Sequence, residues 1–169
     1  MSSASDSMRD FLDDFRETIR VSALRLAAIS EDESRATKNP DKWSPKEIIG
    51  HLIDSAANNH QRFVRAQFTS ELVYPGYEQV AWVKAQNYKD EPWEQLVQLW
   101  TLYNLHLAHV IAAIPAPILN QSRSQHNLDR IGWKKVDKEQ PATLDYFVRD
   151  YVAHLRHHLG QIFVADHIK

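Results

Sequence analysis

Two histidines with helical spacing, His154 and His158, are the best placed residues of this sequence for binding a metal ion. Side chains four residues apart lie about 5–6 Å from each other on one helix face, so both imidazoles can reach the same cation. The chain contains nine histidines, and such a pair also arises by chance. From the spacing alone, the simpler interpretation is a pair near a helix end, one buried and hydrogen-bonded and the other in solvent.

A third histidine, His51, lies among residues typical of a protein core. It stands between the apolar pairs at positions 48–49 and 52–53. His158 is likewise in helical register with Leu155 and Ile162, which we expect to face the core. Burying an imidazole without a partner costs free energy, so a shared metal ion would explain both positions. One imidazole on one helix and two on another form the ligand set of a three-coordinate metal site in a bundle.

Three polar residues follow His51 at helical steps on the same face. They are Ser55, Asn58 and Arg62. This stripe could line a pocket beside a metal ion, where Arg62 would hold a substrate carboxylate or phosphate through paired hydrogen bonds. The simpler interpretation, which the sequence slightly favours, is a helix face in solvent that ends in an exposed arginine.

Four stretches with helical periodicity predict an all-α protein. They span Met8 to about Ser30, Ser44 to about Phe68, Pro92 to about Ile114, and Thr143 to the C-terminus. The second begins with the capping-box pattern Ser-Pro-Lys-Glu at residues 44–47. These lengths match one another and predict a four-helix bundle, whose two long connections could each cross its length. We expect the first connection, at about residues 69–91, to pack across the bundle, and the second, at 115–142, to be polar and irregular.

Length and composition describe one soluble domain over residues 1–169. The chain has 20 Lys and Arg against 22 Asp and Glu, a net charge of −2, and no Cys. Balanced, scattered charge argues against nucleic-acid partners. The lack of Cys excludes disulfides, thiolate metal sites and a cysteine nucleophile. Residues 1–10 do not look like a secretory signal and no stretch is apolar enough to span a membrane, so we expect a cytoplasmic protein without a membrane partner.

Other metal sites find less support. A di-iron bundle needs Glu-x-x-His on two helices, and no Glu here precedes a His by three residues. A His-Glu-x-x-His zinc site is absent because Leu155 follows His154. His106 and His109 are three residues apart, but the sequence indicates no partner for them on another helix. The five tryptophans are interpreted as packing residues: Trp43 at the start of the second helix, Trp82, Trp93 and Trp100 covering bundle surfaces, and Trp133 in the last long loop.

Two segments taken together resemble the DinB/YfiT-like superfamily. They are WSPKEIIGHLIDS at residues 43–55 and HLRHHLGQI at residues 154–162. In this family, a Trp-Ser/Thr-x-x-Glu segment leads to a histidine on the second helix, and His-x-x-x-His on the last helix supplies two more. The resemblance covers nearly the whole chain. It implies a four-helix bundle of up-down-down-up topology in which His51, His154 and His158 hold a divalent metal, most often nickel or zinc.

The resemblance also implies a chemistry. Family members with assigned activities include candidate metal-dependent hydrolases and S-transferases that use a low-molecular-weight thiol such as bacillithiol, mycothiol or glutathione, and many are dimers. Three neutral imidazoles leave the metal its full charge and an open position, where a water or a thiol can lose its proton. Asp54, Asp150 and Gln161 each lie about one helical turn from a predicted ligand and are candidates to hold the ring N–H groups.

We therefore expect a metal-dependent enzyme acting on a small molecule, either a thiol-dependent S-transferase or a hydrolase. The resemblance alone slightly favours the transferase, and it also implies a homodimer. The alternative is a non-catalytic metal-binding protein of a stress response, because many family members have no assigned reaction. Consumption of a thiol or ester that depends on both the metal and His51 would separate the two hypotheses.

Overall fold

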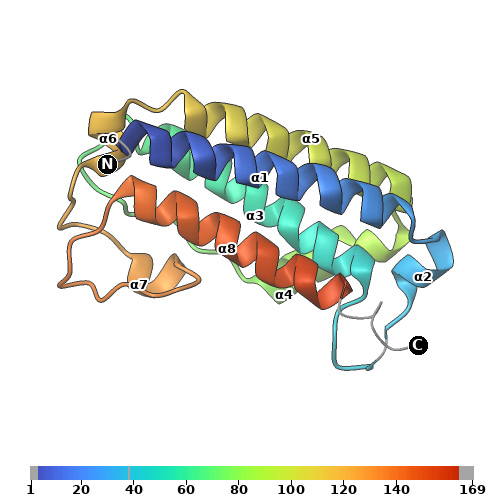
Figure 1. Ribbon diagram of the computed structural model, residues 1–169. Helices are drawn as coiled ribbons and strands as arrows, with labels where there is room; N and C mark the ends of the chain where they lie inside the picture. Colours follow the sequence, from blue (N-terminus) through green and yellow to red (C-terminus); the bar gives the residue numbers. More distant parts are fainter. Residues whose placement is uncertain (1–3, 38, 164–169) are drawn as a thin grey trace.

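The four periodic stretches form the four long helices of a bundle (Figure 1). The computed structural model describes residues 4–37 and 39–163. The long helices are α1 (Ala4–Ala27), α3 (Pro45–Arg65), α5 (Trp93–Ala112) and α8 (Leu144–Phe163). Helices α1 and α8 run in one direction and α3 and α5 in the other, which gives an up-down-down-up topology. The predicted all-α bundle is confirmed.

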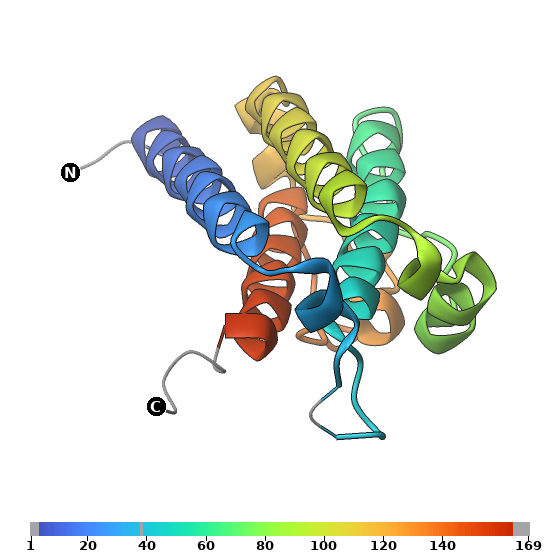
Figure 2. The ribbon, with the colours of Figure 1, turned by 90° about the vertical axis from the view of Figure 1, so that its right-hand side faces the viewer.

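Helix α3 has neighbours on two sides. It packs against α5 on one side and against α8 on the other, and α5 packs in turn against α1 (Figure 2). Phe63 of α3 is fully buried between these helices, and so is Trp100 of α5. Trp100 and Trp93, which is 4% exposed, are therefore core residues, and the prediction that they cover bundle surfaces is wrong. No helix within the described ranges is long and apolar enough to cross a membrane.

Within residues 4–37 and 39–163, five short helical segments lie in the connections. They are α2 (Glu31–Arg35), α4 (Gln79–Gln86), the 3-10 turn η1 (Tyr88–Asp90), α6 (Ala116–Asn120) and α7 (Leu128–Ile131). The first long helix begins earlier than predicted and ends at Ala27, because Ser30 caps α2 through a capping box with Glu33. The expectation of an irregular segment at 115–142 missed α6 and α7. The predicted continuation of α8 beyond Phe163 lies outside the described residues.

The start of α3 is fixed as the sequence predicts. The Ser44 hydroxyl accepts from the backbone N–H of Glu47, whose carboxylate accepts from the Ser44 N–H at 2.8 Å. Lys46, fully buried, anchors this turn further because its ammonium group pairs with Glu31 of α2 and donates to the Glu91 carbonyl at 2.5 Å. The first turn of α3 is thus tied to two connections, and His51 lies one turn further along.

The two long connections follow different paths along the bundle. Because α3 and α5 are parallel, the chain between them returns along the whole bundle, as expected. The connection from α5 to α8 instead begins and ends at one end of the bundle and runs beside the first half of α8. The two connections meet where the Leu72 N–H donates to the Gln125 carbonyl at 2.9 Å and the Asn127 N–H donates to the Leu72 carbonyl at 3.1 Å. They form loops over the α3–α8 face.

Candidate metal centre

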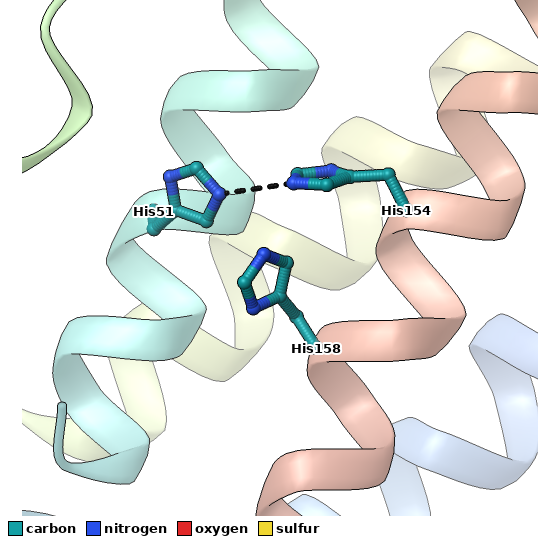
Figure 3. A group of neighbouring side chains, drawn as sticks. All are labelled: His51, His154 and His158. Carbon is teal, nitrogen blue, oxygen red and sulfur yellow. Dashed lines mark hydrogen bonds between the residues drawn. The ribbon is translucent and has the colours of Figure 1, made fainter. Parts of the chain in front are cut away.

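Three histidine side chains converge between α3 and α8 (Figure 3). His51 comes from α3, and His154 and His158 come from successive turns of α8. Their ring centroids are 4.5–5.1 Å apart, and one nitrogen from each lies within 4.8 Å of the others. The three residues that the sequence singled out are therefore brought together. Among the described residues, these three side chains form a group of His, Cys, Asp or Glu residues that could share one metal ion.

The closest pair of nitrogens has the separation that a shared metal ion requires. The Nε2 atoms of His51 and His154 are 3.2 Å apart, and in the absence of a cation one of them donates a hydrogen bond to the other. Metal–nitrogen bonds of about 2.0–2.1 Å in a tetrahedral arrangement place two imidazole nitrogens about 3.3–3.4 Å apart. His51 also keeps a buried Nδ1 without a hydrogen-bond partner among the described residues. The donor set fits a small divalent transition metal.

Burial holds these imidazoles in the neutral form that binds metals. His51 is fully buried and His154 is 8% exposed. Desolvation, with a smaller contribution from His158, lowers the pKa of His51 to about 4, and desolvation with the neighbouring histidines lowers the pKa of His154 to about 3. Burial also lowers the pKa of the half-buried His158. At neutral pH a cation would not have to displace protons from the cluster.

This electrostatic arrangement predicts a pH-dependent stability for the metal-free protein. The folded-state pKa values of His51 and His154 lie below the ordinary 6.5, so below pH 6.5 the unfolded chain binds protons that the folded chain does not. We expect the unfolding free energy to fall by about 1.4 kcal/mol per pH unit for each of these histidines from pH 6.5 to about 4. Denaturant titrations of the metal-free protein at a series of pH values measure this change in unfolding free energy. An unchanged slope in His51→Gln would contradict the explanation.

Gln161 holds the third imidazole in the required tautomer. Its side-chain oxygen lies 2.8 Å from Nδ1 of His158, so this nitrogen donates and Nε2 keeps a free lone pair. The amide nitrogen of Gln161 lies 3.2 Å from Nε2 of His157, an exposed histidine outside the cluster. Of the three residues that the sequence offered as holders of ring N–H groups, Gln161 is the one that contacts a cluster histidine.

The carboxylates of Asp54 and Asp150 accept hydrogen bonds from groups outside the cluster, so the predicted contact of these residues with the ring N–H groups is wrong. Asp54 accepts hydrogen bonds at 2.7 Å from the Tyr88 hydroxyl and from the Gln86 amide. Asp150 accepts from the backbone N–H groups of Trp133 at 2.8 Å and Lys134 at 2.9 Å. Desolvation raises the pKa of both carboxyl groups. Both therefore fix the connections around the cluster: Asp54 the one that contains α4 and η1, and Asp150 the one that follows α7.

Two tryptophans flank the cluster, a role that the sequence interpretation missed. The Trp43 ring lies 5.1 Å from the His51 ring, and the Trp133 ring lies 6.2 Å from His154 and 5.4 Å from His157. The position of Trp43 just before the cap of α3 was a signal that could have placed it there. No local signal could have placed Trp133, because its position depends on the hydrogen bonds from the loop to Asp150.

Replacing Asp150 by alanine should therefore release the loop that carries Trp133. The change removes the charged acceptor of two part-buried N–H groups, and the loss of hydrogen bonds to a charged group costs roughly 1–3 kcal/mol of unfolding free energy. We also expect faster amide hydrogen exchange at Trp133 and Lys134. Asp145→Ala is a matched control, because Asp145 lies on the same helix and pairs with the partly exposed Arg149, a contact worth only about 0.3–0.5 kcal/mol. Equal losses in both variants would contradict the prediction.

The polar stripe after His51 is covered by protein, so the interpretation as a face in solvent is wrong. Ser55 and Arg62 are 3% and 6% exposed, and Asn58 is half-buried. The Arg62 guanidinium donates to the Pro75 carbonyl at 2.8 Å and to the Asn59 side-chain oxygen at 3.4 Å, so it holds the crossing connection. Asn58 and Arg62 line a cavity of about 490 Å³ at the C-terminal end of α3, together with residues 68, 69 and 71 of the connection.

The fold and the site together define a class of protein. It is a four-helix bundle of up-down-down-up topology that holds three imidazoles between two of its helices. The chain belongs to the DinB superfamily, whose sequence model matches residues 14–162. The fold is similar to that of YfiT from Bacillus subtilis, with a TM-score of 0.73 over 96% of this chain and 87% of YfiT at 16% identity. YfiT is described as a probable metal-dependent hydrolase with an unusual four-helix bundle topology. No curated protein matches the chain.

Proposed function

We propose that this protein is a metal-dependent hydrolase of a small-molecule substrate, with His51, His154 and His158 as ligands of a divalent nickel or zinc ion. The observation that carries the proposal is the convergence of three imidazole nitrogens within 4.8 Å, two of them 3.2 Å apart, in a setting that keeps them neutral. The description of YfiT, which shares the fold, as a probable metal-dependent hydrolase supports the same reaction class.

The residues around the cluster have distinct roles in this proposal. His51, His154 and His158 would hold the divalent metal through neutral imidazoles, and the metal would supply a water acidified to a pKa of about 7 as the nucleophile. Gln161 fixes the orientation and tautomer of His158. The rings of Trp43 and Trp133 flank the imidazoles of His51 and His154. In this proposal the nucleophile comes from outside the protein, which fits a chain without Cys.

The second candidate is the transfer of a low-molecular-weight thiol, such as bacillithiol, mycothiol or glutathione, at the same centre. The supporting observation is again the neutral ligand set, which would leave the charge of the cation uncompensated, so that the cation would supply the acidity needed to deprotonate a bound thiol. In both reactions the protein supplies the metal ligands and the side chains around them. The product depends on whether water or a thiol is the co-substrate. A non-catalytic metal-binding protein would contain the same cluster and show neither reaction.

The test is turnover by the metal-loaded protein over two substrate panels. Wild-type protein loaded with Zn²⁺ or Ni²⁺ is assayed with small esters and amides in water, and separately with electrophiles plus each thiol. We expect hydrolysis that disappears with a chelator and in His51→Ala but persists in His109→Gln, a substitution of an exposed histidine on α5. Thiol consumption with the same dependence would establish the transferase instead. Rates equal to those of His51→Ala on every substrate would overturn both enzyme proposals.

We also propose that the chain forms a homodimer through the outer face of α5. Leu99, Leu102 and Leu105 are 46%, 67% and 41% exposed on this helix. Between Gln95 and Ala112 the helix contains no Asp, Glu, Lys or Arg, so two copies of this face can meet without burying a charge. Sedimentation equilibrium tests the proposal: we expect a dimer, and Leu102→Glu should shift the equilibrium towards monomer.

A further inference from the structure

A second group of histidines lies on the opposite side of α3 from the candidate metal centre. His60 follows His51 by nine residues, a rotation of about 900° or two and a half helical turns. It therefore points away from α8 and towards α5, where its ring lies 5.1 Å from the ring of His106. The sequence indicates no partner for His106 and His109 on another helix, but in the fold His60 of α3 lies beside His106.

The two rings meet edge to face, in the same arrangement as the rings of two proposed metal ligands. The centroid distance of 5.1 Å and interplanar angle of 83° between His60 and His106 are the same as those between His51 and His154. In each pair one imidazole belongs to α3 and the other to a neighbouring helix. His60 is half-buried and His106 is exposed in the single chain, so in a monomer an ion from solvent can reach the pair without opening the bundle.

The surroundings of the pair are compatible with a neutral His60 whose ring nitrogen can bind a metal ion. The Tyr103 hydroxyl lies 3.5 Å from Nδ1 of His60 and donates or accepts according to the imidazole tautomer; in the tautomer with the hydrogen on Nδ1, the lone pair of Nε2 is free to bind a cation. The stretch of α5 that carries His106 has no Lys or Arg to repel a cation. The ring of His109 stacks on His106 at 6.3 Å and an angle of 26°, outside the edge-to-face pair.

We propose that His60 and His106 form a second binding site for a divalent transition-metal ion, bridging α3 and α5. Two imidazoles bind zinc, nickel or copper, and water completes the coordination. The site binds more weakly than the three-histidine centre, because it has one protein ligand fewer and is more open to solvent. It stands apart from the proposed enzyme activity, since none of its residues contacts the first cluster.

Zinc titration of the metal-free protein tests the proposal without any activity assay. Equilibrium dialysis against Zn²⁺ followed by elemental analysis should give two equivalents for wild type, one tight and one weaker. His60→Gln and His106→Gln should each lose only the weaker equivalent. His109→Gln is the matched control and should keep both. His51→Ala should keep the weaker equivalent, so failure of this site and failure of the three-histidine centre are distinguishable.

Three outcomes would overturn the second site. They are a single equivalent in wild type, a weaker equivalent that survives both His60→Gln and His106→Gln, and its loss in His109→Gln, which would indicate loose binding by any exposed histidine of α5. A second measurement guards against unfolded variants. In a His154→Ala/His158→Ala variant loaded with Cu²⁺, in which His51 is left as a single imidazole, the electron paramagnetic resonance spectrum should show coupling to two imidazole nitrogens, and a spectrum without it would also contradict the proposal.

Discussion

Metal affinity should fall by more than about 100-fold when His51 is replaced by alanine. Substitutions of residues that merely orient ligands cost about 10–100-fold in affinity, and the loss of one of three ligands exceeds that. The effect should be large because His51 is the one member of the cluster on α3, and its Nε2 is 3.2 Å from that of His154. Without it, α8 offers only a helical pair.

Isothermal titration with Zn²⁺ measures this loss for the tight site. His109→Gln is again a suitable control, because the residue is exposed on α5 and takes no part in the cluster. Gln161→Leu should show a smaller reduction, since it frees the Nδ1 hydrogen of His158 but removes no ligand. If His51→Ala retained the wild-type affinity of the tight site, the ion would bind elsewhere and the assignment of the ligands would be wrong.

The second large effect is expected for Gly50→Ala, beside His51 on α3. A Cβ atom at position 50 would overlap ring atoms Cγ, Cδ2 and Cε2 of Tyr88. Tyr88 is buried, at 4% exposure, and its hydroxyl donates to Asp54 at 2.7 Å. The ring cannot move without breaking this bond and shifting η1. We expect a loss of roughly 1–3 kcal/mol or more in unfolding free energy, measured by chemical denaturation.

Gly160→Ala provides the matched control for this prediction. Gly160 also lies inside a long helix, but a Cβ there would meet no atom within 4 Å. Alanine has the higher helix propensity, so this variant should gain about 0.5–1 kcal/mol. Opposite signs for the two variants would support the close approach of Tyr88 to α3. A stable Gly50→Ala protein with an unchanged hydrogen bond between Tyr88 and Asp54 would contradict it.

The parts of the site that local sequence rules predicted are those governed by helix geometry. The spacing of His154 and His158 determines that both face one side of α8, and the capping box at Ser44 sets where α3 begins. Gln161 could be predicted for the same reason, because it lies three residues after His158 on the same helix. These relations require no knowledge of the connections.

The parts that could not be predicted depend on where the connections lie. Asp54 and Asp150 have the spacing of residues that orient imidazoles, yet their carboxylates are taken by Tyr88 and by the backbone of Trp133. Arg62 looks like an exposed helix end until the crossing connection covers it and accepts its hydrogen bond through the Pro75 carbonyl. No helical period describes these long-range contacts, because they join segments that are distant in sequence.

The most direct test of the central claim is the metal content of untagged wild-type protein beside His51→Ala and His158→Ala. Elemental analysis after dialysis to remove weakly bound ions should find about one nickel, zinc or other divalent transition metal per wild-type chain and none in either variant. That result would establish the three-histidine centre as the tight metal site. Wild-type protein that stays free of metal after incubation with zinc and nickel, or variants that keep the metal, would contradict the account.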